Sequence, residues 1–225
     1  MSTSNKFKVL ITGYEPFGEE KVNPSEIVAK EAALAVGKLE NVDVVAAVLP
    51  VSFKRARTAL NELLKTHKPD IALSLGLWGG ISYVTLERVA INVMDARIPD
   101  NDGNQPIDEP IEPEGPAAYF TTLPIKSILK KLREEGIPAM ISNSAGTFLC
   151  NFALYELLHH GATFGYPKRA GYMHIPYLPE QASVKRSWCG IPPSMSLDLV
   201  VKAVVTAVKV TVERFHIIED EKIPP

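Results

Sequence analysis

Short apolar strands that alternate with amphipathic helices constrain the fold of this chain more than any other feature. Val42–Leu49 is Val-rich throughout, as expected of a buried parallel strand, whereas Lys54–His67 carries its apolar side chains on one helical face. This alternation predicts an α/β protein: a single-domain α/β/α sandwich, residues 1–225, around a mostly parallel, twisted sheet. The other predicted strands are 8–12, 70–75, 139–142 and 171–175, and the other predicted helices are 25–36, 124–135, about 147–160 and 196 to about 215.

The alternation breaks between residues 83 and 118. Tyr83–Val93 is extended and apolar apart from Glu87, Arg88 and Asn92, and residues 95–118 hold five prolines without any periodicity. A loop of this length in a compact domain usually has a function. We therefore expect residues 95–118 to cover or support a site, or to pack against a neighbouring subunit.

Charge and composition argue against several classes of function. The net charge is −2 and the basic residues are scattered, so we expect no nucleic-acid partner. No apolar stretch approaches the roughly 18–20 residues that span a bilayer, and no signal-peptide pattern precedes the first strand, which predicts a cytoplasmic protein without a membrane partner. Two cysteines are too few for a disulfide framework.

Cys150 is the first candidate for chemistry. It follows the predicted strand 139–142 and a turn containing Gly146, and therefore lies in the first turn of a helix. Free amide groups and the positive end of the helix dipole favour a thiolate at that position. A small buried core residue fits the same pattern, because most free cysteines are inert.

A thiolate needs a proton carrier, and His174 is the histidine best placed to serve. It ends the apolar strand 171–175, at the carboxyl edge where open α/β sheets form their sites. A hydrogen-bonded core histidine is an equally good interpretation of this feature alone. The remaining histidines lie near the ends of predicted helices and are expected on the solvated surface: His67, His159, His160 and His216.

The third member of such a site would be an acid that orients the imidazole. Glu87 lies within an otherwise apolar extended run, where an unpaired charge would be costly. A local ion pair with Arg88 is disfavoured, because adjacent strand residues point to opposite faces. The other candidates lie on the following loop: Asp95, Asp100 and Asp102.

Three segments together resemble the pyroglutamyl peptidase I family. GLWGGISYVTLERVAIN, which contains Glu87, is similar to its glutamate signature; SNSAGTFLCN to its cysteine signature; and GYMHIPYLPEQ to its histidine segment. TGYEPFG and DARIPDNDGNQP also match, and the likeness runs in order from about Lys8 to Gln181. Three correctly spaced signatures are far more specific than any one of them.

The resemblance implies a cytoplasmic, usually homotetrameric cysteine peptidase that removes N-terminal pyroglutamate from peptides without a metal or cofactor. It implies Cys150 as nucleophile, His174 as general base and acid, and Glu87 as the orienting residue, with Asp100 as an auxiliary acid. A lactam-binding pocket is implied at Tyr14, Phe17, Asn23, Phe148 and Leu149. Cys189, in a Pro-rich segment, could form an intersubunit disulfide.

The chain departs from the family pattern in the segment Leu77–Ile81, which lacks the usual Gln and Arg, and at Tyr14, where Phe is usual. The first departure leaves open a binding protein that keeps the pocket without turnover. Another hydrolase or a nucleoside phosphorylase on a similar framework is the second alternative, since fold alone does not give function.

Overall fold

A six-stranded mixed sheet is the centre of the computed structural model, which describes residues 6–18, 20–188 and 190–224. The spatial order of its strands is β2 (Val42–Leu49), β1 (Phe7–Tyr14), β3 (Ile71–Leu77), β8 (Arg169–Ile175), β4 (Val84–Glu87) and β7 (Ala139–Ser142). β2, β1, β3 and β8 are parallel, whereas β4 runs antiparallel to β8 and parallel to β7. The predicted α/β fold with a mostly parallel sheet is confirmed.

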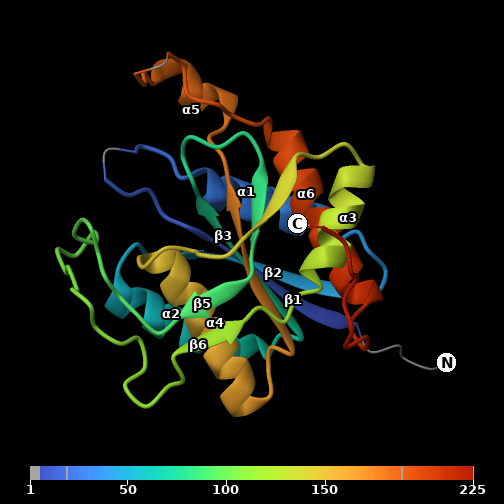
Figure 1. Ribbon diagram of the computed structural model, residues 1–225. Coiled ribbons are helices and arrows are strands. Elements are labelled where there is room, and N and C mark those ends of the chain that lie inside the picture. The colour runs from blue at the N-terminus through green and yellow to red at the C-terminus, as the bar shows by residue number, and fades with distance from the viewer. Residues whose placement is uncertain (1–5, 19, 189, 225) are drawn as a thin grey trace.

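Helices cover both faces of this sheet (Figure 1). α1 (Pro24–Val36), α3 (Ile125–Glu134) and α6 (Leu197–Glu213) share one apolar core with it, and α2 (Phe53–His67) and α4 (Leu149–Phe164) share the other. Each buried Leu, Ile or Val side chain in these cores contributes about 1.5–3 kcal/mol relative to an exposed one. The sandwich is therefore held mainly by the apolar stripes that the sequence periodicity indicates.

The extended run that was predicted for residues 83–93 divides at Arg88. β4 joins the main sheet, and β5 (Val89–Ile91) pairs with β6 (Ala118–Phe120) in a separate two-stranded ribbon. The Arg88 amide donates to the Ser142 carbonyl (2.9 Å), while its own carbonyl accepts from the Thr121 amide (2.8 Å). Arg88 thus links the two sheets, which a period-2 pattern alone does not reveal.

A short helix, α5 (Pro179–Val184), lies between the predicted strand 171–175 and the predicted helix that begins at residue 196. Pro179 stands in its first turn, where proline fits a helix without losing a hydrogen bond. In Figure 1, α5 projects beyond the end of the sheet. Among the helices of the described residues, none has the length and apolarity required to cross a membrane.

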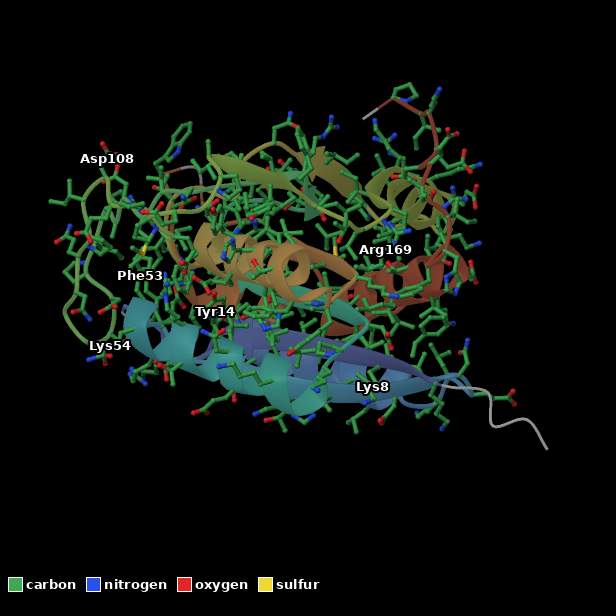
Figure 2. The ribbon with its side chains drawn as sticks, turned by 90° about the horizontal axis from the view of Figure 1, so that it is seen from below. Lys8, Tyr14, Phe53, Lys54, Asp108 and Arg169 are labelled. Atoms are coloured by element: carbon green, nitrogen blue, oxygen red, sulfur yellow. The ribbon has the colours of Figure 1, made fainter. Side chains whose placement is uncertain are left out.

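The loops gather at the carboxyl ends of the parallel strands. In Figure 2, Lys8 and Arg169, near the starts of β1 and β8, lie toward one end of the molecule, and Tyr14, Phe53 and the loop carrying Asp108 lie toward the other. This second end is the edge at which the sequence predicts a site.

Candidate active site

Cys150 lies in the first turn of α4, as predicted. The helix begins at Leu149, and Gly146, in the turn before it, has a positive φ of 76° that favours glycine. The Cys150 side chain is half-buried. Amide groups at a helix start have no partner within the helix, so this turn of α4 can stabilise negative charge on or near the sulfur.

Glu87 and His174 meet because β4 and β8 are antiparallel neighbours. Thr85 stands opposite His174 in the ladder, and Glu87 lies two residues further along the same face. Glu87 is fully buried, and one of its carboxylate oxygens, Oε1, binds His174 Nδ1 (2.8 Å) and accepts from the Thr85 hydroxyl (2.6 Å). The imidazole is thereby fixed with its other nitrogen free for proton transfer.

The surroundings of His174 favour its charged form. Burial would lower its pKa, but the charge and hydrogen bonding of Cys150, together with Glu87, raise that pKa from 6.5 to about 9. At neutral pH His174 therefore holds a proton beside the cysteine. A protonated imidazole next to a cysteine at a helix start is the usual arrangement of an activated thiolate.

Gly76, near the end of β3, makes room for this assembly. It pairs with His174 in the parallel ladder between β3 and β8. A Cβ atom at this position would lie 2.0 Å from the Tyr172 hydroxyl oxygen and 3.2 Å from the Cys150 sulfur. The Gly76 backbone therefore approaches the reactive centre in a way that other residues cannot.

Tyr14 and Leu149, two of the predicted pocket residues, are almost fully buried. The Tyr14 hydroxyl donates to the Leu149 carbonyl (2.7 Å). This carbonyl belongs to the peptide whose N–H is that of Cys150. The hydroxyl that distinguishes Tyr14 from the usual Phe thus has a definite partner directly beside the candidate nucleophile.

Phe17 and Phe148 are half-buried and form an aromatic wall next to Cys150. Their ring centroids are 6.0 Å apart, and Phe148 also packs edge-on against Phe53 at 5.4 Å. Phe53 was not singled out from the sequence, because it also fits the apolar face of α2. Rings arranged in this way offer a flat, uncharged surface to a ligand.

Asn23 bonds to the loop before α1 and caps that helix. Its side chain caps α1 by accepting from the Ser25 amide (3.1 Å) and donates to the Glu15 carbonyl (3.0 Å). Both contacts hold the loop between β1 and α1, which carries Phe17. Asn23 therefore fixes the shape of the predicted pocket.

Asp100 is buried, and its carboxylate links its own loop to the start of α2. It accepts from the backbone amides of Phe53 (3.0 Å), Asp102 (3.0 Å) and Asn104 (2.8 Å). In the part of the chain that the structure describes, the Asp100 carboxylate makes no hydrogen bond to His174. Asp102, another acid considered above, pairs on the surface with Arg55 at 2.8 Å.

The long loop 95–118 bonds to segments that carry candidate site residues. Thr147 and Asp95 exchange two hydrogen bonds just before α4, and Asn101 donates to the Pro16 carbonyl (3.0 Å) beside Phe17. These contacts are those expected of a supporting loop.

Besides Phe53, three residues of the site were not predicted from the sequence. Thr85 lies two residues before Glu87, a spacing that could have indicated a shared strand face. Trp78 is 42% exposed and stands edge-on to the His174 ring at 5.5 Å, so the departure at Leu77–Ile81 places an aromatic ring beside the histidine. Tyr172 could not be predicted, because its position fits an ordinary core residue of a strand.

Within the described ranges, no group of three or more His, Cys, Asp or Glu side chains could hold a metal ion.

Comparison with known proteins gives a consistent result. The model of a family described as pyroglutamyl peptidase matches residues 7–214. The pyrrolidone-carboxylate peptidase of Pyrococcus furiosus is 52% identical over 206 residues, which cover 92% of this chain and 98% of that protein. The protein of the same name from Thermococcus litoralis is 48% identical and covers 96% and 99%.

Solved structures agree with these relatives. The pyrrolidone carboxyl peptidase of Thermococcus litoralis superimposes with a TM-score of 0.93 at 48% identity, covering 97% of this chain and all of that one. A mutant enzyme from Pyrococcus furiosus gives 0.89 at 51% identity, with 93% of this chain and 100% of the other covered.

Proposed function

This chain belongs to the pyroglutamyl peptidase family, and from that premise we propose that it is a cysteine peptidase that removes N-terminal pyroglutamate from peptides. The observation that carries the proposal is the contact of buried Glu87 with His174 beside Cys150, at the start of α4. The reaction of a phosphorylase does not need a cysteine, histidine and glutamate arranged in this way.

Cys150 is the nucleophile in this scheme. Its thiolate attacks the carbonyl carbon between pyroglutamate and the next residue, so that a sulfur–carbon bond forms. His174 gives its proton to the departing amine as the carbon–nitrogen bond breaks, and then takes a proton from the water that hydrolyses the thioester. Glu87 keeps the imidazole oriented through both steps, as an acid does in other triads.

The first turn of α4 supplies the oxyanion site. The Cys150 amide is the natural donor, and the Tyr14 hydroxyl on the carbonyl of the same peptide polarises it further. Removing one such donor from other enzymes costs about 3–4 kcal/mol of transition-state stabilisation.

Pyroglutamate is a neutral lactam without a free amine, so its pocket needs flat apolar walls and few charges. Phe17 and Phe148 provide such walls, Asn23 fixes the loop that carries Phe17, and Tyr14 and Leu149 bond to each other directly before Cys150. Asp100 contributes by fixing the loop 95–118.

We further propose that the protein assembles as a homotetramer. Apolar side chains on and after α5 are exposed, among them Val184 and Ile191, and they are suited to contact another copy. The intersubunit disulfide predicted at Cys189 falls outside the described residues, and it stays a prediction, as does the cytoplasmic location.

Incubation with a pyroglutamyl amide and with its prolyl counterpart tests the function. Release from the first substrate only, abolished by iodoacetamide and by Cys150→Ser, is the expected result. Near-normal turnover by Cys150→Ser would refute the assigned nucleophile. Tight binding of a pyroglutamyl ligand by the wild type without cleavage would instead indicate the binding protein that the altered segment Leu77–Ile81 left open.

A further inference from the structure

Tyr172 lies in β8, two residues before His174, and shares its face of the sheet. The β4–β8 ladder pairs Thr85 with His174 and Leu86 with Met173, and Glu87 and Tyr172 are the next residues of the two strands. The Tyr172 ring lies 4.9 Å from the His174 ring and is 1% exposed. Tyr172 is therefore enclosed within the site without having a role in the scheme above.

The hydroxyl of Tyr172 is buried and makes no hydrogen bond within the described part of the chain. It lies beside Gly76, in the space that a side chain there would fill, and the Cys150 sulfur borders the same space. A buried hydroxyl without a partner destabilises the fold, and phenylalanine would fill the same volume without this cost. We therefore expect the Tyr172 hydroxyl to find a hydrogen-bond acceptor in one state of the enzyme.

The Cys150 thiolate is such an acceptor. We propose that the Tyr172 hydroxyl donates a hydrogen bond to this thiolate and is a further catalytic residue of the peptidase reaction, an inference that rests on the function proposed above. Tyr172 would stabilise the charged sulfur on one side while His174 stabilises it on the other.

The Tyr14 hydroxyl, from β1, already donates to the Leu149 carbonyl. Glu87, from β4, binds the far side of the imidazole through Oε1, and its Oε2 atom makes no hydrogen bond within the described residues. Burial raises the pKa of Tyr172 well above its ordinary value, and the charge of Cys150 raises it further. Tyr172 therefore keeps its proton throughout the working range of the enzyme and can serve as a donor.

Stabilising the thiolate changes the rate in a way that depends on pH. More of the enzyme carries the charged sulfur at low pH, but each thiolate is a slightly weaker nucleophile, because nucleophilicity falls with thiol pKa. Loss of the Tyr172 hydroxyl should therefore slow the enzyme on the acid limb of its pH profile and leave it unchanged, or slightly faster, on the plateau. A residue that only packs would produce no such crossover.

Tyr172→Phe tests the proposal, because it removes one oxygen and keeps the ring. We expect the midpoint of the pH dependence of Cys150 alkylation by iodoacetamide to rise by about one unit, since a hydrogen bond to a charged group has that order of effect. The acid limb of kcat/KM should move with it, which corresponds to a roughly tenfold loss at low pH. The melting temperature should be unchanged or higher, because the lost oxygen has no partner in the resting fold.

Tyr119→Phe is the matched control. The Tyr119 hydroxyl bonds to His159 (3.0 Å), which is not part of the triad, so neither pH profile should move in this variant. Alkylation and kcat/KM profiles of Tyr172→Phe that superimpose on those of the wild type would overturn the proposal. The alkylation midpoint is measured without substrate. It therefore tests Tyr172 even if the wild type fails to cleave pyroglutamyl amides, which would refute the proposed function alone.

Discussion

Glu156, on the buried side of α4, should make this protein less stable as the pH rises toward neutrality. Its side chain is almost fully buried, and its closest cation is Arg57 of α2, 3.1 Å away. Arg57 also pairs with Glu112 of the loop 95–118 and donates to the Ile111 carbonyl (2.6 Å). Glu156 therefore shares one cation with a second acid.

Burial raises the pKa of Glu156 from 4.5 to about 7; Arg57 opposes this shift and Glu112 adds to it. Between these two values the folded protein binds more protons than the unfolded chain. The free energy of unfolding therefore falls as the pH rises from about 4.5 to 7, and it is flat above that range. At 1.36 kcal/mol per pKa unit, the cost of the ionised carboxylate at pH 8 is at most about 3.4 kcal/mol.

Glu156→Gln removes this cost but keeps a polar group to bury, so we expect a gain of about 1–2 kcal/mol at pH 8. For a chain of this size that corresponds to a rise in melting temperature of roughly 2–8 °C. Thermal unfolding followed by circular dichroism at pH 8 and pH 5 measures the effect, which should nearly vanish at pH 5.

Glu26→Gln is the control, because Glu26 pairs with Lys30 on the surface and its loss should change stability by less than about 1 kcal/mol at either pH. A Glu156→Gln protein that is less stable than the wild type at pH 8 would show that the pair with Arg57 outweighs burial. The same gain at both pH values would show that the effect does not come from ionisation.

Three further substitutions test the site. Glu87→Gln should lower kcat/KM for a pyroglutamyl amide by about a thousandfold or more, because the imidazole loses its orienting charge; a loss below tenfold would contradict this role. Phe148→Ala should raise KM about tenfold with little change in kcat, since it removes a wall that binds ground and transition states alike; an equal fall in kcat would refute that assignment. Asp100→Asn should lower the free energy of unfolding in urea by about 1–3 kcal/mol with kcat/KM within about threefold, whereas a large loss of activity at unchanged stability would make Asp100 part of the chemistry.

Most of the helices and strands could be predicted because their periodicity is strong. Val42–Leu49 forms β2 with the predicted bounds, and the predicted helix 54–67 differs from α2 by one residue. β6 and α5 were missed because three or six residues are too few to show a period. The direction of β4 was equally hidden, since a strand has the same pattern whichever way it runs.

The reversal of β4 is also the reason why the sequence could name Glu87 and His174 but not their contact. A parallel β4 would lie in a different register against β8, whereas the antiparallel ladder sets Thr85 opposite His174 and brings Glu87 onto the imidazole. Residue types and the family resemblance led to these side chains. The contact itself depends on the pairing of strands 87 residues apart in the chain.

The contacts of two tyrosine hydroxyls beside Cys150 could not be predicted from residue patterns. Tyr14 and Tyr172 lie within apolar strands and are buried like core residues, so each pattern predicts packing and nothing more. In three dimensions one hydroxyl donates to the Leu149 carbonyl and the other is left without a partner beside the sulfur. The first can strengthen the Cys150 amide as a donor to an oxyanion, and the second can stabilise the thiolate that precedes it. Negative charge moves from the sulfur to the carbonyl oxygen of the substrate during attack, so the two hydroxyls would stabilise that charge in succession.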